Sequence, residues 1–213
     1  MKSESFPERT PQVFVVDDDR AILKAFSRLL GSAGFNVKTF DSPAEFLGQH
    51  DPDVPGCALL DVGMHGMDGL ELQAELANVG ARRPIVFVTG RDDARTSVRA
   101  LKAGAVDYLT KPVDGDDLIA AVSSALARDE KARAQRSEIA AIRARYNLLT
   151  PREREVMSHV VAGRLNKQIA CDLGTVEKTV KVHRARVMAK MQGRTVAALV
   201  HLTERLRAGE ERI

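Results

Sequence analysis

Three aspartates, a threonine and a lysine each follow or end an apolar, strand-like run of this sequence. They are Asp17, Asp18, Asp61, Thr89 and Lys111. Carboxylates that lie close together repel one another, and Mg²⁺, which prefers oxygen ligands, relieves that repulsion. A carboxylate beside such an ion can attack a phosphoryl group and form an acyl phosphate, while a lysine neutralises the transferring oxygens. Brought together, these residue types predict a phosphoryl-accepting site.

The segments that carry these residues alternate between strands and helices. The apolar runs are Gln12–Val16, Asn36–Phe40, Cys57–Leu60, Pro84–Val88 and Val106–Leu109. The stretches between them have helical spacing, which favours a parallel sheet covered by helices on both faces. In such a sheet, ligands bind outside the carboxyl ends of the strands. The sequence therefore predicts a five-stranded, doubly wound parallel sheet that brings the five polar residues to one edge.

A plainer alternative is that Asp17 and Asp18 only cap a helix and that Asp61 only begins a loop. Aspartate is common in both roles. Scattered surface residues would not fall systematically at strand ends, however, and here all five do. We therefore favour the phosphoryl-accepting site.

The C-terminal part of the chain contains helical patterns only. Four short helices are expected, from a capping box at Thr150-Pro151-Arg152-Glu153 to about Ala162, over Asn166–Leu173, over Val176–Met191 and over Thr195–Leu206. In the third helix, Val176, Val180, Val187 and Met191 predict a stripe that faces the core. The charged, Ala-rich stretch 127–147 predicts a solvated helical linker.

The opposite side of the helix Val176–Met191 is cationic and carries Lys178, Lys181, Val182, Arg184 and Ala185. Lysine and arginine reach phosphates and guanine edges, and valine can touch a thymine methyl group, so this side suits a DNA major groove. The alternative is the solvated face of a core helix. Residues 1–126 have 13 Lys and Arg against 19 Asp and Glu, a net charge of −6, whereas residues 127–213 have 19 against 10, a net charge of +9. That asymmetry favours a polyanion partner for the C-terminal part.

Two features of the composition concern the cellular compartment. No apolar stretch is long enough to span a membrane, and the N-terminus lacks the apolar segment of an export signal. Cys57 and Cys171 each lie in an apolar pattern, which is typical of buried thiols in a reducing environment. We expect a cytoplasmic protein.

The motifs around the five polar residues resemble those of two-component receiver domains over residues 11–127. They are Val15-Val16-Asp17-Asp18-Asp19, Asp61-x-x-Met64-x-Gly66-Met67-x-Gly69, Val88-Thr89-Gly90, Lys102-Ala103-Gly104-Ala105 and Tyr108-Leu109-x-Lys111-Pro112. The resemblance implies a flavodoxin-like fold with Asp61 as the phosphoacceptor. It also implies a cis Lys111–Pro112 bond. Mg²⁺ would be bound directly by Asp18, Asp61 and the Gly63 carbonyl, with Asp17 helping through water. The implied switch residues are Thr89, Tyr108, which turns inward, and Lys111, which pairs with the phosphate.

Two residues depart from the receiver pattern. His65 stands where relatives commonly have proline, and Gly63 stands where a larger residue is usual, so we expect a loosened loop after Asp61. A lone loop histidine is normally solvated, and no metal role is assigned to His65. By the same resemblance, Arg91 flanks the path of the attacking water and is expected to control the lifetime of the phosphoryl group.

The C-terminal motifs resemble a LuxR-type helix-turn-helix over residues 147–208. They are Leu149-Thr150-Pro151-Arg152-Glu153-Arg154-Glu155-Val156, Gly163-x-x-Asn166-Lys167-x-Ile169-Ala170, Leu173-Gly174 and Lys178-Thr179-Val180-Lys181-Val182-His183-Arg184. The resemblance implies that Lys181, Val182 and Ala185 face bases. Lys167, Lys178, Thr179 and Arg184 would contact the DNA backbone.

The two resemblances together identify the NarL/FixJ group, on the FixJ side. The expected domains are an α/β receiver (11–127), a helical linker (128–147) and an all-α, four-helix LuxR-type domain (148–208). The resemblance implies a regulator, not an enzyme. A partner histidine kinase would phosphorylate Asp61, which promotes homodimerisation and sequence-specific binding to double-stranded DNA. RNA polymerase is the further expected partner, because activation of transcription is the expected outcome.

Two other functions are compatible with parts of this pattern. The first is a Mg²⁺-dependent aspartyl-phosphate phosphatase, but such an enzyme usually carries a second aspartate two residues after the nucleophile, where this chain has Gly63. The second is a DNA-binding protein whose receiver serves only for dimerisation, without phosphorylation. The complete set of pocket residues argues against it.

The dimer is expected to form through the helix Asp92–Ala103, which Thr89 and Tyr108 flank, together with the strand Val106–Leu109. This surface carries Arg95, Arg99, Lys102 and Asp107, whose opposite charges can pair across a two-fold axis. The alternative is that these charges are simply solvated.

Overall fold

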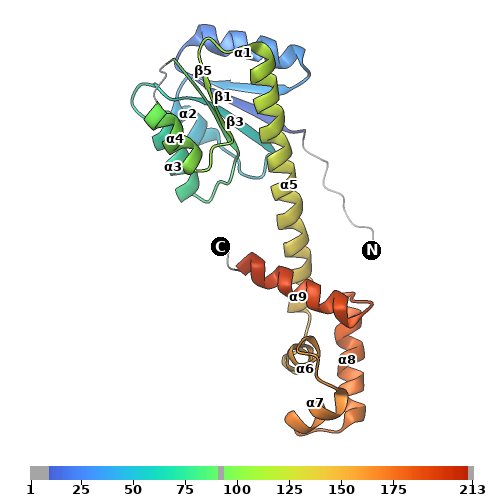
Figure 1. The fold of residues 1–213 in the computed structure, drawn as a ribbon. Helices are drawn as coiled ribbons and strands as arrows, with labels where there is room; N and C mark the ends of the chain where they lie inside the picture. Colours follow the sequence, from blue (N-terminus) through green and yellow to red (C-terminus); the bar gives the residue numbers. More distant parts are fainter. Residues whose placement is uncertain (1–9, 91–93, 211–213) are drawn as a thin grey trace. The chain divides into compact units, whose positions relative to one another are not determined.

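The structure, a computed structural model, describes residues 10–90 and 94–210 of the 213-residue chain (Figure 1). The chain divides into two compact units, Met1–Ala132 and Arg133–Ile213. Among the residues that the structure covers, no helix is long and apolar enough to cross a membrane.

The N-terminal unit is built on a five-stranded parallel sheet. Its strands are β1 (Gln12–Val16), β2 (Asn36–Phe40), β3 (Gly56–Asp61), β4 (Ile85–Thr89) and β5 (Asp107–Thr110), in the spatial order β2-β1-β3-β4-β5. Every pair of neighbouring strands is parallel. All residues of β3 and β4 are buried, which explains why these segments are nearly continuous apolar runs. The predicted sheet is therefore confirmed, with strand ends within one residue of those expected.

Helices cover both faces of this sheet and create two separate cores (Figure 1). The helices of this unit are α1 (Arg20–Ser32), α2 (Pro43–Gln49), α3 (Gly69–Asn78), α4 (Ala94–Lys102) and the start of α5 (Gly115–Asn147). Phe46 of α2 and Leu72 of α3 belong to one core, whereas Leu30 of α1 and Leu118 of α5 belong to the other. Apolar side chains therefore cover both faces of the sheet, and the polar side chains that follow the strands lie at its carboxyl edge.

Helix α5 runs without a break from the sheet into the C-terminal unit. Its 33 residues include the stretch 127–147, which is helical as predicted. The expectation that this stretch is solvated is wrong near both ends, however. Asp129 is 2% exposed, and its Oδ2 accepts a hydrogen bond from the Gly56 N–H at 2.7 Å. Ile142 is also 2% exposed and lies in the C-terminal core. The charged, Ala-rich composition of the stretch did not indicate that Asp129 and Ile142 are buried.

The C-terminal unit packs the end of α5 with four helices around one core. They are α6 (Pro151–Val161), α7 (Asn166–Asp172), α8 (Glu177–Met191) and α9 (Val196–Glu210). Val156 of α6, Ile169 of α7, Val187 of α8 and Leu199 of α9 are fully buried in this core. The all-α arrangement expected for this part is thus confirmed.

Two side chains that the apolar patterns placed in a core are exposed. Val176 is 66% exposed, because it precedes α8 as the N-cap residue in an extended conformation (φ −97°, ψ 150°) and is not part of the helix. Cys171 of α7 is also exposed, which corrects the expectation of two buried thiols. Cys57 is buried as expected, and burial raises the pKa of its thiol to about 12.

A buried glutamate joins α6 to α8. Glu153 completes the capping box of α6, where its Oε2 accepts from the Thr150 N–H at 2.9 Å. The same oxygen lies 2.6 Å from Lys190 Nζ of α8. The hydrogen bond and charge of Lys190 hold the pKa of Glu153 at about 2. The ionised carboxylate is therefore the form that the folded unit prefers.

We predict that Glu153→Gln lowers the free energy of unfolding of the C-terminal unit by about 1–3 kcal/mol at neutral pH, because it removes a charge-assisted bond from a buried site. The folded-state pKa is depressed, so this stabilisation is complete above the ordinary glutamate pKa of 4.5 and is lost as the pH falls from there toward 2. Urea unfolding of the full chain, followed by circular dichroism at several pH values, measures both effects. Glu155→Gln is the control, because Glu155 is exposed on the same helix. A Glu153→Gln protein as stable as this control would contradict the prediction.

Candidate functional site

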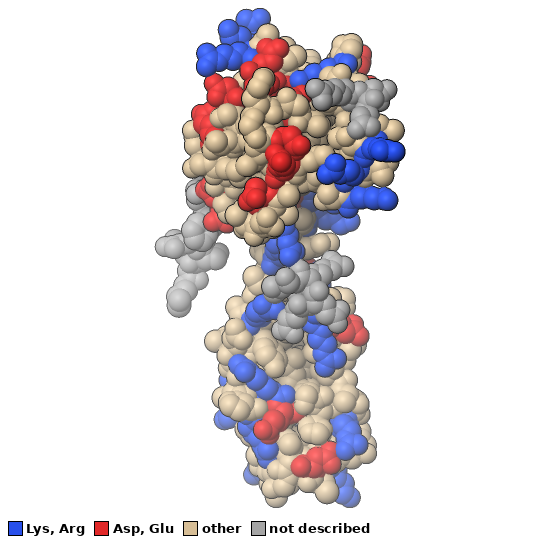
Figure 2. Space-filling model, turned by 90° about the vertical axis from the view of Figure 1, so that its left-hand side faces the viewer, with Lys and Arg blue, Asp and Glu red and all other residues tan. Residues whose placement is uncertain are grey.

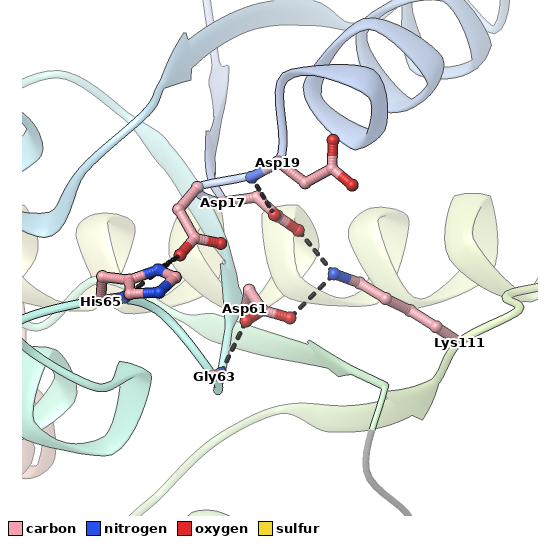
Figure 3. Close-up of polar contacts among 7 residues, drawn as sticks. Asp17, Asp19, Asp61, Gly63, His65 and Lys111 are labelled. Carbon is pink, nitrogen blue, oxygen red and sulfur yellow. Dashed lines mark hydrogen bonds and ion pairs between the residues drawn. The ribbon is translucent and has the colours of Figure 1, made fainter.

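Two buried carboxylates and one ammonium group meet at the carboxyl edge of the sheet (Figure 3). Asp17 follows β1 and is 2% exposed, and Asp61 ends the neighbouring strand β3 and is 8% exposed. Lys111 follows β5, and its Nζ lies 2.6 Å from Asp17 Oδ2 and 2.8 Å from Asp61 Oδ1. The structure thus brings together three of the residues that the sequence placed at strand ends, across 94 positions of chain.

The charges of this cluster depend on one another. Burial raises the pKa of Asp17, while the hydrogen bond from Lys111 opposes that rise. Burial alone would lower the pKa of Lys111, but its hydrogen bonds to Asp17 and Asp61 outweigh this effect, and the pKa of Lys111 is raised overall. Lys111 is therefore a permanent cation shared by two carboxylates. Such sharing offsets the cost of burying them side by side.

Asp18 contacts a different partner, the loop residue His65, which is labelled in Figure 3. Asp18 Oδ2 accepts from the His65 backbone N–H at 3.2 Å and also contacts His65 Nδ1. The hydrogen bond from the imidazole is the main reason that the pKa of Asp18 is lowered. The His65 side chain is 98% exposed, as expected for a loop, but its contact with Asp18 was not predicted, and no pattern in the sequence signals it. With Asp18 turned to His65, the described residues contain no preformed cluster of three metal-binding side chains.

The loop after Asp61 is held close to that residue at two points. The Gly63 N–H donates to Asp61 Oδ2 at 2.6 Å. A Cβ on Gly63 would meet this oxygen at 3.5 Å, an ordinary contact, so the backbone does not require glycine there. Gly69, at the start of α3, is different, since a Cβ would lie 2.3 Å from the Asp61 carbonyl oxygen. Only glycine therefore allows α3 to begin against the end of β3, a role that the sequence motif contained but did not explain.

The three expected switch residues lie on β4 and β5 and just after β5. Thr89 ends β4 with its side chain buried, and its carbonyl oxygen accepts from the Lys111 N–H at 2.6 Å. The Tyr108 ring packs 6.3 Å from the Phe87 ring, centroid to centroid, and its hydroxyl oxygen is shielded from solvent. The Lys111–Pro112 peptide bond is cis, as expected. Arg91, the residue expected to control the phosphoryl lifetime, lies outside the described residues.

The surface expected to dimerise carries both charged and apolar side chains. Arg95, Arg99 and Lys102 are exposed on α4, whereas Asp107 is half-buried and accepts from the Tyr108 N–H at 2.8 Å. Val98 and Leu101 of α4 are also exposed, at 49% and 46%, and were not predicted to belong to this surface. An exposed apolar pair beside charges is compatible with a protein contact.

The residues expected to contact DNA lie on α7 and α8. Lys167, Lys178, Lys181, Val182 and Ala185 are exposed, and Thr179 and Arg184 are half-buried. Lys181 Nζ lies 3.0 Å from Glu177 Oε1 at the start of α8. Arg184 Nη1 donates to Asn166 Oδ1 at 2.9 Å, which ties α8 to the first residue of α7. Part of the Arg184 guanidinium is thus engaged within the unit.

The turn between α7 and α8 is braced by a neighbouring helix. Arg152 Nη2 of α6 donates to the Leu173 carbonyl oxygen at 2.6 Å. Gly174 follows with φ +60°, a conformation that glycine adopts readily. On the face shown in Figure 2, the C-terminal unit presents more Lys and Arg than Asp and Glu side chains. The turn before α8 is thus fixed to α6, and α8 exposes Lys178 and Lys181 to solvent.

Comparisons with known families match both units. Residues 13–123 match the response regulator receiver domain, and residues 147–203 match the bacterial regulatory proteins of the luxR family. Nodulation protein W of Bradyrhizobium diazoefficiens is 42% identical over 91% of this chain and 86% of its own length. The transcriptional regulatory protein FixJ of the same organism is 40% identical over 92% of this chain and 95% of its own. The solved structure of the response regulator StyR is 42% identical, with a TM-score of 0.85 over 92% of this chain and 98% of that one.

These matches extend over both units, and they are to transcriptional regulators and not to enzymes, which decides against the phosphatase alternative. The receiver match contains the cluster of Asp17, Asp61 and Lys111, and the luxR match contains α7 and α8. The chain therefore belongs to the NarL/FixJ group of two-component response regulators, with a receiver domain followed by a LuxR-type DNA-binding domain.

Proposed function

We propose that a partner histidine kinase transfers a phosphoryl group to Asp61 and that this transfer controls DNA binding, dimerisation and transcription, in the activating direction. The observation that carries the proposal is the position of Lys111, whose ammonium group is hydrogen-bonded to both Asp17 and Asp61. A carboxylate held beside a permanent cation and facing the edge of the sheet is suited to accept an anionic group.

The residues of the site fit a magnesium ion. The donors are all oxygens, which Mg²⁺ prefers, and one or two carboxylates suffice for it because the ion keeps several waters. Asp18, Asp61 and the Gly63 carbonyl would hold it directly, with Asp17 acting through water. When bound, the ion would screen the charge of the carboxylates and of the incoming phosphoryl group. Asp18 would have to exchange its contact with His65 for the ion.

The chain's own groups divide the remaining work. An oxygen of Asp61 attacks the phosphorus atom of the phosphohistidine, the phosphorus–nitrogen bond breaks, and the histidine leaves with the electron pair of that bond. Lys111 pairs with the oxygens of the transferred group, and the Thr89 hydroxyl donates a hydrogen bond to one of them. Hydrolysis of the acyl phosphate then restores Asp61, with Arg91 expected to control its rate.

Dimerisation and DNA binding are the output of the site. Movement of Thr89 toward the phosphoryl group would leave room for Tyr108 to shift. Tyr108 lies on β5, which pairs with the strand of Thr89 and packs beside α4. We place the dimer contact on α4 and β5, through Arg95, Arg99, Lys102 and Asp107. Two LuxR-type domains would then bind two half-sites together, which raises affinity without new base contacts. RNA polymerase is the proposed further partner, and the cytoplasm is the proposed location.

We predict that Asp61→Asn incorporates no phosphate from acetyl phosphate with Mg²⁺ and stays folded, because the change removes the nucleophile and relieves repulsion with Asp17. Phos-tag electrophoresis measures incorporation, and circular dichroism measures folding. Asp117→Asn is the control, since Asp117 is exposed at the start of α5 and should leave phosphorylation unchanged. Phosphate incorporation into the Asp61→Asn protein would rule out Asp61 as the acceptor.

Two lysines should differ in what their loss does to DNA binding. We expect Lys181→Ala to weaken binding to the specific operator by about 1–3 kcal/mol and to relax the preference at one base position. Lys167→Ala should weaken binding to all sequences alike and reduce the salt slope by about one. Anisotropy titrations on operator and random duplexes at several salt concentrations distinguish them. Equal losses on both duplexes for the two variants would refute a base-reading role for Lys181.

We predict that acetyl phosphate with Mg²⁺ converts the full chain from monomer to dimer in sedimentation velocity runs. Reversal of both charges in Arg95→Glu/Lys102→Glu should weaken this dimer about tenfold or more, about 1.4 kcal/mol. Arg28→Glu, an exposed position on α1, is the matched control and should dimerise normally. A protein that stays monomeric with the phosphodonor, or a double variant that dimerises as well as the control, would remove this interface.

A further inference from the structure

A groove of about 450 Å³ lies in the C-terminal unit between the end of α5, α6 and α9. Its lining residues come from these three helices and include no residue of α7 or α8. In Figure 1, α7 lies at one end of this unit, and α9 with the end of α5 lies at the other. The groove is therefore separate from the proposed DNA contacts.

The floor of the groove is apolar. Met157 of α6 and Leu206 of α9 reach it from the buried core. Val161 and Tyr146 line it as partly buried side chains that pack against the same core. Met157 and Leu206 are nearly fully buried, so Val161 and Tyr146 supply the accessible apolar surface of the groove, which another apolar side chain could cover.

The rim of the groove is positively charged. Arg143, Arg154 and Arg207 line it, and no aspartate or glutamate does. The Arg154 guanidinium lies over the Tyr146 ring, 5.0 Å from the ring centre, and a cation–π interaction favours this position.

Other arginines of this unit have carboxylate partners. Arg152, Arg164 and Arg205 pair with Glu155, Asp172 and Glu138, respectively. Within the described part of the chain, neither Arg154 nor Arg207 forms an ion pair. The rim therefore keeps a net positive field above an apolar floor.

We infer that this groove is a docking site for an acidic, amphipathic segment of a partner protein. Guanidinium groups recognise carboxylates through paired hydrogen bonds, and the floor can take an aromatic or aliphatic side chain from between the acidic residues. A partner segment of this chemistry matches both properties of the groove. The inference goes beyond the proposed function, because no lining residue belongs to the phosphorylation site or to the proposed DNA contacts.

The backbone of DNA is the other polyanion that could meet these arginines. Phosphate contacts need cations but gain nothing from the apolar surface of Val161 and Tyr146. The proposed DNA face on α7 and α8 also lies on other elements. A protein segment explains the floor and the rim together, so we favour it.

The test uses the full chain and a displayed library of peptides of about twelve residues, in which half the positions are Asp or Glu and the rest are random. Enriched peptides are then labelled and titrated by anisotropy. We expect micromolar affinity that weakens with salt. Arg154→Glu/Arg207→Glu should weaken binding about tenfold or more, because it reverses the rim charge. Arg194→Glu, exposed in the turn before α9, should bind like the wild type.

Binding of duplex DNA to the same proteins separates the two polyanions. If the groove serves a protein partner, Arg154→Glu/Arg207→Glu binds DNA as Arg194→Glu does, and DNA does not displace the peptide. The inference is overturned if the acidic library enriches no better than a neutral one, or if enriched peptides bind the double variant and the control equally. It is also overturned if DNA displaces the peptide or if the double variant alone loses DNA binding, since the groove would then belong to the DNA contact.

Discussion

The structure of the receiver edge depends on one ammonium group shared between two buried carboxylates. Asp17 follows β1 and Asp61 ends the neighbouring strand β3, so the order of the sheet forces them together. Without a cation their burial would be strongly unfavourable. Lys111 supplies the cation from the far strand β5. A phosphoryl group on Asp61 adds negative charge at the point where Lys111 is already divided between two partners. The balance of charge at this edge of the sheet must therefore change, whichever of its two partners Lys111 keeps.

That change reaches β4 and β5 through the backbone as well as through side chains. The Lys111 N–H donates to the Thr89 carbonyl oxygen, so the residue that holds the carboxylates is also bonded to the end of β4. Tyr108 lies three residues before Lys111 and packs on Phe87 of the same strand β4. The site, the switch residues and the α4–β5 surface are thus parts of one connected edge. This connection gives the proposed dimer contact a physical route from Asp61.

The sequence was sufficient for features that depend on local pattern. Strand ends, helix caps and the residues at the carboxyl edge follow from apolar runs and capping boxes, and the structure has them where expected. Prediction from the sequence failed where the burial or the contacts of a residue depend on a partner far away in the chain. Asp129 is buried because it accepts from Gly56, 73 residues away, and His65 meets Asp18 from a loop 47 residues away. The prediction that Val176 is buried was wrong for another reason. Apolar spacing cannot distinguish the first residue of a helix from the N-cap residue before it, which here faces solvent.

Helix α5 places a further constraint on how the two units communicate. Its buried Asp129 is bonded to the first residue of β3, while Glu138 pairs with Arg205 of α9 and Ile142 enters the C-terminal core. Only about nine residues separate these anchors, about 14 Å of helix. Asp129 is bonded to the strand that ends in Asp61, so a change in β3 can reach α5 directly through the Gly56–Asp129 hydrogen bond.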